Sequence, residues 1–265
     1  MTNTPDTASM VTAKSEAVQA FILHHMSDSR TWSWLPAGHE QLPAFLTLHG
    51  IMVIGSGILL IFCLAMACRR PAPVPHGWLN FVEFFVKYIR DDMAIPFLGE
   101  KDGRRLTPLF CSLFFYILVM NLVGLIPCFY TATANINVTL GLASITLFFM
   151  IAGTILRNGP IAFLKGFAPP GIPWYILILL VPVEFVGLFI RAAALAIRLF
   201  ANEMAGHLVV FSLLGMLIVY GATALPISIM AVLVFIQEIF VAFLQAYIFT
   251  LLSAVFIGQR YHPAH

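Results

Sequence analysis

Charged side chains are scarce in this sequence, and their scarcity excludes several classes of protein. Only 10% of the 265 residues are charged and 60% are hydrophobic, whereas a soluble globular domain carries about 25% charged residues to keep its surface wet. The 14 Lys and Arg residues are nearly balanced by 12 Asp and Glu residues, so the chain also lacks the basic excess of a nucleic-acid-binding protein. We therefore expect an integral membrane protein.

Cysteine is rare as well, and its spacing fits no metal motif. The four cysteines lie within or at the edges of apolar runs, which predicts small, buried hydrophobic side chains. They are Cys63, Cys68, Cys111 and Cys128. We expect no cofactor, no bound metal and no disulfide.

The N-terminal region lacks a long apolar run. Residues 1–40 contain no apolar stretch ahead of a small-residue cleavage site, so they do not have the pattern of a signal peptide. We expect residues 1–40 to form an extramembrane tail and residues 41–265 to form the membrane domain. This domain contains no internal repeat of the kind from which secondary transporters are built.

Uncharged runs predict three of the membrane crossings. Residues 46–68 suit one crossing of about 20 residues and end at two arginines. Residues 106–156 suit two helices around a turn, which Pro127 and the polar residues 131–137 supply. Residues 157–160 should end the second helix of this pair.

Two further apolar runs are too long for upright crossings. Residues 174–219 have the pattern of one helix, which would measure roughly 69 Å against a hydrocarbon core of roughly 30 Å. Residues 226–258 would measure roughly 50 Å. Pro182 is a candidate kink, but no turn signal follows it, so we expect one inclined helix in each run.

Residues 79–93 show an amphipathic pattern instead, which predicts a helix lying on the membrane surface. Its charged face consists of Glu83, Lys87, Arg90 and Asp91, and its apolar face of Leu79, Val82, Phe85, Val86, Ile89 and Met93. The predicted fold class is therefore an all-α integral membrane protein. It has about five transmembrane helices and one interfacial helix, and the last two transmembrane helices are long and steeply inclined.

The basic residues between the runs fall on one side of the membrane if there are five crossings. The positive-inside bias makes that side cytoplasmic, so we expect the N-terminus outside and the C-terminus inside. These residues are Arg69, Arg70, Lys87, Arg90, Lys101, Arg104, Arg105, Arg157, Lys165 and Arg260.

Several ionisable side chains lie inside the two long runs, with no nearby exit to water. A charged side chain at the bilayer centre costs on the order of 2.5 to 3.5 kcal/mol on insertion scales, so these residues are functional candidates by default. They are Glu184, Arg191, Arg198, Glu203, His207 and Glu238.

Their spacing separates two faces of the first long helix. Glu184, Arg191 and Arg198 are seven residues apart and share a face. Glu203 and His207 point roughly 140 to 180° away from Arg198. The face of Arg198 also carries small residues that allow another helix to pack closely, namely Gly187, Ala194, Ala201, Asn202 and Ala205.

The second long helix carries two polar residues that can face those of the first. Glu238 and Gln245 are seven residues apart on one face. One antiparallel packing of the long helices would bring Glu238 towards His207 and Gln245 towards Arg198, which predicts a polar seam at membrane depth. Purely structural alternatives remain open.

Glu184, Arg191 and Glu238 fit structural ion pairs that fix helix register, and His207 fits a core histidine. Arg198 has no acid three or four residues away to neutralise it within its helix.

The residues around Arg198 resemble a signature of subunit a of the rotary F-type ATP synthases. A second segment and an early turn are also similar to that family, in the right order and at the right distance. The resembling segments are residues 195–202, Ala205, Gly206, His207, residues 243–249, residues 121–127 and residues 133–137.

The resemblance implies a stator subunit of the bacterial inner membrane. Its two long, nearly horizontal helices would face a rotating ring of c subunits, with peripheral stalk b subunits and the rest of the F1F0 complex as further partners. Such a chain carries no ATP chemistry itself. By resemblance, Arg198 faces the ring carboxylate, and the proton path contains Asn202, His207, Glu238, Gln245, Glu184 and Arg191.

Glu203 departs from the family pattern, in which an apolar residue commonly follows the asparagine. Its place in the proton path is therefore open, as is a Na+-translocating version of the same subunit. Two other classes are weaker. A haem-anchoring subunit needs facing histidines, and only His49 and His207 lie in the predicted spans, whereas an independent transporter needs repeats and glycine-broken helices.

Overall fold

A computed structural model describes residues 15–16, 19–20, 47–68, 77–126, 129–167, 173–220 and 225–261. Within these ranges the long elements are helices and no strand occurs. The predicted N-terminal tail, Arg69 and Arg70 lie outside the described residues, apart from two short helical pieces of the tail.

The helices follow one another with short connections. They are α2 (Leu48–Cys68), α3 (Trp78–Tyr88), η1 (Ile89–Ala94), α4 (Ile95–Gly124), η2 (Ala132–Ala134), α5 (Ile136–Phe148), η3 (Phe149–Gly153), α6 (Thr154–Asn158), α7 (Pro160–Lys165), α8 (Trp174–Tyr220) and α9 (Leu225–Tyr261). Elements η1 and η3 are π-helical and η2 is a 3-10 turn.

Among the described residues, five helical segments are long and apolar enough to cross a membrane. They are Leu48–Met66, Leu79–Gly124, Ile136–Asn158, Trp174–Val219 and Pro226–Tyr261. This confirms the predicted all-α fold and its five crossings. The predicted turn also lies where expected, between α4 and α5, and the second helix of that pair ends at Asn158, before Gly159 with φ 85°.

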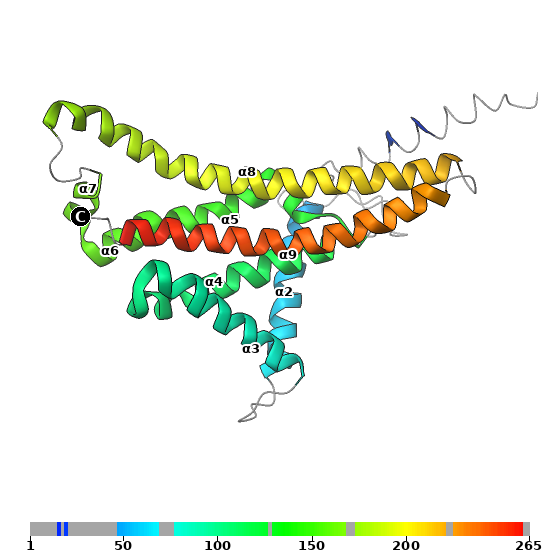
Figure 1. The fold of residues 1–265 in the computed structure, drawn as a ribbon, viewed down its shortest axis with the longest axis horizontal. Coiled ribbons are helices and arrows are strands. Elements are labelled where there is room, and N and C mark those ends of the chain that lie inside the picture. Colours follow the sequence, from blue (N-terminus) through cyan, green and yellow to red (C-terminus); the bar gives the residue numbers. More distant parts are fainter. Residues whose placement is uncertain are drawn as a thin grey trace, which may run out of the picture.

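The long helices α8 and α9 run antiparallel and side by side along the longest axis of the molecule (Figure 1). They contain 47 and 37 residues, and Pro182 does not interrupt α8. Figure 1 shows α2, whose 21 residues suit one upright crossing, running across their direction. Both long helices are therefore steeply inclined to α2, as the length of their apolar runs predicts.

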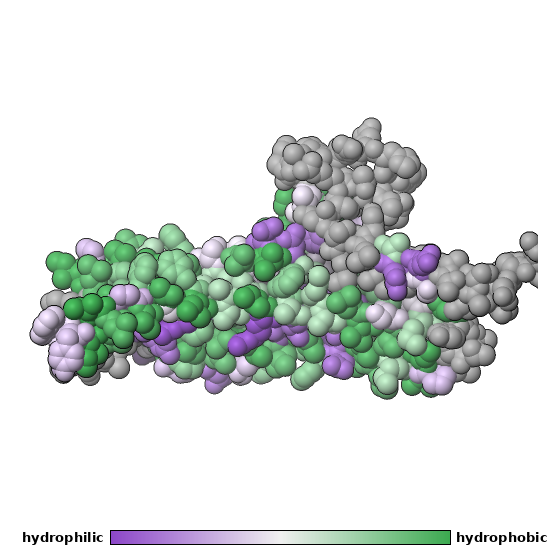
Figure 2. Space-filling model, turned by 90° about the horizontal axis from the view of Figure 1, so that it is seen from above, coloured by the Kyte–Doolittle hydropathy of each residue, from purple (hydrophilic) through white to green (hydrophobic). Residues whose placement is uncertain are grey.

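The core lies where α4 and α5 pack against the long helices. Fully buried side chains meet there from α4, α8 and α9, including Phe110, Ile117, Leu195 and Phe249. The outer surface is apolar as well: Leu179 on α8 is 72% exposed and Phe240 on α9 is 67% exposed. The face in Figure 2 is mostly hydrophobic, with hydrophilic residues confined to a few patches, as a lipid-facing protein requires.

The amphipathic segment at residues 79–93 does not end as a separate helix. Its faces are as predicted, because Ile89 and Met93 are buried while Glu83 and Lys87 form an exposed ion pair. However, α3 continues through the π-helical η1 directly into α4. The extra residue of a π-turn depends on tertiary packing and leaves no periodicity signal in the sequence.

Gly99 turns the chain at the beginning of α4. Its backbone has φ 76° and ψ 167°, a conformation that glycine adopts without strain. Beyond this kink, Gly103 packs so closely on the first turn that a Cβ would lie 2.9 Å from the Cα of Ile95. The kink directs residues 100–105 towards the ends of α6 and α9.

The two described cysteines, Cys63 and Cys111, are free thiols. Both are half-buried at the surface of apolar helices rather than fully buried as predicted, because α2 and α4 expose part of their circumference. No group of three or more ligand-type side chains occurs among the described residues. The side chains of Cys68 and Cys128 lie outside them.

Candidate functional site

A cluster of polar groups lies where α8 passes the turn between α4 and α5. His207 Nε2 is 2.7 Å from Thr131 Oγ1 and 3.2 Å from Glu203 Oε1. Glu203 and Thr131 are each 6% exposed. The two predicted residues of this face of α8 are therefore joined to each other, and to a hydroxyl from another part of the chain.

Thr131 was not predicted as a site residue, because the polar stretch 131–137 was interpreted only as a turn. Its hydroxyl can also donate to the carbonyl of Gly124, 3.4 Å away. A Cβ at Gly124 would lie 2.8 Å from Thr131 Cγ2, so glycine there permits this close approach. The occurrence of several hydroxyl residues between two apolar runs was the available signal.

The turn that carries Thr131 is held rigidly. Thr133 Oγ1 donates to Asn121 Oδ1 at 3.0 Å, and both residues are fully buried. This bond ties the turn to the end of α4. Thr131 is consequently presented to His207 from a fixed position.

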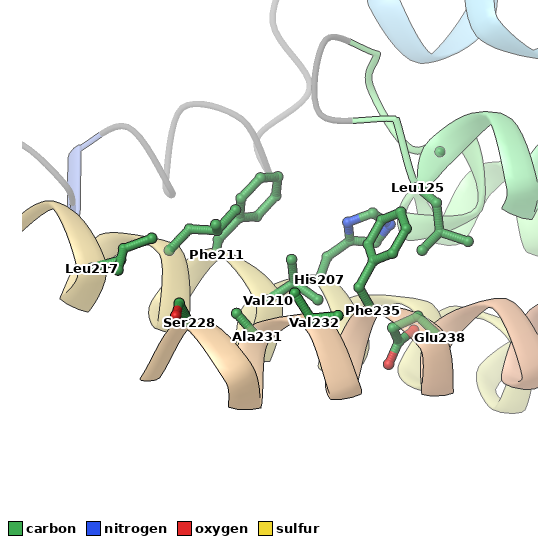
Figure 3. A pocket seen from close by; sticks show the side chains of 12 residues that line it. Leu125, His207, Val210, Phe211, Leu217, Ser228, Ala231, Val232, Phe235 and Glu238 are labelled. Atoms are coloured by element: carbon green, nitrogen blue, oxygen red, sulfur yellow. The ribbon is translucent and has the colours of Figure 1, made fainter. Parts of the chain in front are cut away.

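Glu238 of α9 lies near the cluster of His207, Glu203 and Thr131. A Cβ on Gly206 would overlap the Glu238 carboxylate, so the missing side chain at Gly206 makes room for it. Figure 3 shows His207 and Glu238 lining one cavity between α8, α9 and the end of α4. The predicted approach of Glu238 to His207 is confirmed.

The cavity has a volume of about 320 Å³ and an otherwise mostly apolar lining. Leu125, Phe211 and Phe235 form part of its wall in Figure 3. A cavity of this size has room for several water molecules, each of which occupies about 30 Å³ in the liquid. Polar groups at His207 and Glu238 give such water its hydrogen-bond partners.

Gln245 and Arg198 are not brought together by a hydrogen bond. Gln245 is 4% exposed, and its Nε2 has no hydrogen-bond partner among the described residues. Arg198 instead lies on the exposed surface of α8. The seven-residue spacing shows that Glu238 and Gln245 share a face of α9, but it does not show which part of α8 that face meets. The approach of Gln245 to Arg198 could therefore not be predicted from spacing alone.

Arg198 has no partner within the described part of the chain. No ion pair or side-chain hydrogen bond reaches its guanidinium there, although an arginine stays charged in any protein environment. Its surroundings are as predicted, since Ala194, Ala201 and Ala205 are exposed and Asn202 is half-buried. The result is a lone cation on a smooth, apolar helix surface.

Glu184 and Arg191 form a second polar cluster, farther along α8. Glu184 Oε1 lies 3.4 Å from Arg191 Nη2 and 3.1 Å from Arg260 Nη2, and Arg191 Nη1 lies 3.3 Å from Gln259 Oε1. Arg260 is 6% exposed, with its guanidinium 4.3 Å above the Phe167 ring. Glu184 and Arg191 therefore form the ion pair that the structural alternative predicts.

Arg260 and Gln259 were not predicted in this cluster. In the sequence, Arg260 is only a basic residue at the end of a predicted span. Its pairing with Glu184 connects residues 76 positions apart, which no local pattern reveals.

Comparison with known proteins places this arrangement in a family. The family model described as ATP synthase A chain matches residues 50–258. Relatives named ATP synthase subunit a include one from Anaeromyxobacter sp. (strain Fw109-5), which is 42% identical over 219 residues, or 80% of this chain and 53% of the relative. Another, from Chloroherpeton thalassium, is 41% identical over 255 residues, or 89% of this chain and 75% of the relative.

A relative of the same name from Myxococcus xanthus is 39% identical over 225 residues, or 83% of this chain and 74% of the relative. The chain spans about half the length of the Anaeromyxobacter relatives that it matches. The matched region includes α2 to α9 almost entirely, with both polar clusters and Arg198. On this evidence the chain belongs to the ATP synthase A chain family.

Proposed function

We propose that this chain translocates protons as the stator a subunit of an F-type ATP synthase, in which proton flow turns a ring of c subunits. The ATP chemistry takes place on other subunits, and peripheral stalk b subunits hold the stator in place. The family supports the role, and the observation that carries the mechanism is the unpaired, exposed guanidinium of Arg198.

The proposed task of Arg198 follows from the cost of a charge in lipid. A ring carboxylate crosses lipid readily only when it is protonated and neutral. Beside Arg198 it loses its proton, because the fixed positive charge stabilises the carboxylate. The same charge repels a proton that would pass directly from one side of the membrane to the other.

The outer half of the proton path runs through the cavity at His207 and Glu238. Imidazole and carboxyl groups both accept and release protons, and both line this cavity, so His207 and Glu238 can exchange protons there. Glu203 and Thr131 extend this path, and Asn202 and Gln245 line it towards Arg198. Glu184 and Arg191 belong to the other half, on the ring-facing side of α8.

Protons are favoured over Na+ by the chemistry of this cavity. Hard cations prefer a shell made of oxygen ligands alone, whereas the group that joins Thr131 and Glu203 here is an imidazole nitrogen, His207 Nε2.

The orientation follows from the basic residues. Lys101, Arg104, Arg105, Arg157 and Arg260 belong on the cytoplasmic side of the bacterial inner membrane. The N-terminus then lies outside, the C-terminus lies inside, and the His207 cavity opens towards the outside.

The decisive experiment is Arg198→Ala in inside-out membrane vesicles that contain the whole complex. Proton-driven ATP synthesis and ATP-driven proton pumping should both be lost, because the ring carboxylate no longer ionises at the stator. Co-purification of the variant with the small c-ring protein in detergent checks assembly. The control Arg104→Ala removes an exposed arginine that pairs with Glu100 at 2.9 Å, and it should synthesise ATP normally. Near-normal synthesis by the Arg198 variant overturns the proposal.

A further inference from the structure

A second cavity lies far from the His207 site along α9. It has a volume of about 450 Å³ and opens where the start of α4, the η3–α6 segment and the end of α9 meet. Its lining contains Lys101, Asp102, Arg105, Arg157, Tyr261 and Leu156, among others. The proton path proposed above does not use it.

The cavity holds more positive than negative charge. Its one carboxylate, Asp102, is already paired with Arg157, with Oδ2 and Nη2 2.7 Å apart. The other acid close in sequence, Glu100, pairs with Arg104 outside the cavity. Glu100 and Asp102 are therefore both already paired with arginines.

Lys101 and Arg105 form no ion pair within the part of the chain that the structure describes. They are four residues apart on one face of α4, where like charges repel each other. Arg157, which is paired with Asp102, lines the same cavity and supplies further N–H donors. An anion between Lys101 and Arg105 would relieve this repulsion.

The walls of the cavity are held in place before any ligand binds. The Arg157 guanidinium lies 5.2 Å above the Tyr261 ring, and Asn158 Nδ2 donates to the Tyr261 carbonyl at 3.1 Å. The Tyr261 hydroxyl rests against Gly153, where a Cβ would overlap it. Gly153 is the last residue of the π-helical η3, a type of irregularity that is frequent at functional sites.

An apolar surface continues directly from this basic cavity. Leu156 is 86% exposed, and on the adjoining α7 Ile161 is 71% and Leu164 is 65% exposed. In a membrane protein such a surface faces acyl chains. The cavity therefore combines cations for an anionic group with an apolar path for hydrocarbon.

We propose that this cavity binds the phosphodiester headgroup of an anionic membrane phospholipid, between Lys101, Arg105 and Arg157. Basic pockets between transmembrane helices recognise such headgroups, and arginine and lysine bind phosphate through charge-assisted hydrogen bonds. Inorganic phosphate shares this chemistry, but it has no acyl chain to cover Leu156. The lipid is therefore the ligand that fits both parts of the site.

The test uses the purified full chain in detergent and native mass spectrometry to count retained lipids. Phosphatidylglycerol should be retained about tenfold better than phosphatidylcholine with the same acyl chains, because both carry the phosphodiester but the cations of the cavity repel the choline ammonium of the latter. The double variant Lys101→Gln/Arg105→Gln should lose this preference. The matched control Arg104→Gln removes a neighbouring charge outside the cavity and should keep it.

Circular dichroism and thermal unfolding show whether the double variant is folded, and the single variant Arg105→Gln serves if it is not. Equal retention of both lipids by the wild type, or an unchanged preference in the folded variants, overturns the proposal. If millimolar inorganic phosphate stabilises the wild type as strongly as phosphatidylglycerol does, the ligand is a free anion and the lipid assignment fails. The readout is lipid retention, so this outcome is independent of proton translocation.

Discussion

At the scale of single residues, the site centres on one imidazole nitrogen. When His207 Nε2 carries a proton, its one N–H can donate to Thr131 Oγ1, 2.7 Å away, or to Glu203 Oε1, 3.2 Å away. When it is bare, the Thr131 hydroxyl can donate to it instead of to the Gly124 carbonyl. Thr131 therefore has a partner in both states, which suits a residue beside a proton carrier.

Removing members of this cluster should slow proton flux without preventing assembly. His207→Ala or Glu238→Ala should lower ATP-driven proton pumping in inside-out vesicles by at least about tenfold, because each removes a group that exchanges protons. Glu203→Gln keeps the size of the side chain but removes its charge, and its flux should lie between those of wild type and His207→Ala. Pumping is measured across pH 6 to 9 by quenching of a pH-sensitive dye.

A matched control lies one turn beyond His207 on the same helix. Ser212 is exposed, and its hydroxyl bonds only back to the Leu208 carbonyl, so Ser212→Ala should pump normally. If His207→Ala and Glu238→Ala both pump at the wild-type rate throughout this pH range, the relay hypothesis is wrong. If only Glu203→Gln does so, Glu203 is a local partner of His207 outside the path.

At the scale of elements, the function depends on how closely α8 and α9 approach. Two contacts set their register: the Glu238 carboxylate against Gly206, and Arg260 paired with Glu184 at 3.1 Å. The first brings Glu238 to the cavity that His207 also lines, and both residues belong to the proposed proton path. The second ties the far end of α9 to α8 through a guanidinium that is almost fully buried.

Gly206→Ala should therefore separate the two helices locally. The added methyl group overlaps the Glu238 carboxylate, and overpacking of this kind costs about 1 to 3 kcal/mol. We expect a lower Tm of the purified chain in detergent and a lower pumping rate in vesicles. In the control Gly141→Ala the new methyl group meets no atom within 4 Å, so the Tm should stay the same or rise. An unchanged Tm in the Gly206 variant would contradict the close packing.

The long helices could be predicted because each has a local cause in the sequence. Uncharged runs mark the crossings, and the lack of a turn signal after Pro182 indicates one long α8, as observed. The seven-residue spacing of Glu238 and Gln245, with antiparallel packing of the long helices, also predicts that Glu238 lies near His207, and both residues line one cavity. By contrast, the π-helical η1 and η3 and the pair Glu184–Arg260 arise from packing between segments far apart in the chain, which no local pattern encodes.

At the scale of the whole molecule, polar groups are divided between two ends. Lys101, Arg105 and Arg157 gather with the end of α9 around the basic cavity. The turn with Thr131 follows the other end of α4 and meets His207. Because α4 crosses the membrane between these two ends, the proposed orientation makes one of them cytoplasmic and the other external.

This orientation predicts opposite labelling of two introduced cysteines. Arg104, near the start of α4, has a side chain that is 61% exposed, and Asn137 is exposed at the start of α5. In a chain whose four native cysteines are replaced by alanine, Arg104→Cys should react with a membrane-impermeant maleimide only in inside-out vesicles. Asn137→Cys should react only in right-side-out vesicles, because α4 carries the chain across the bilayer between the two positions. The cysteine-free parent is the control, and labelling of both variants from the same side would overturn both the orientation and the crossing by α4.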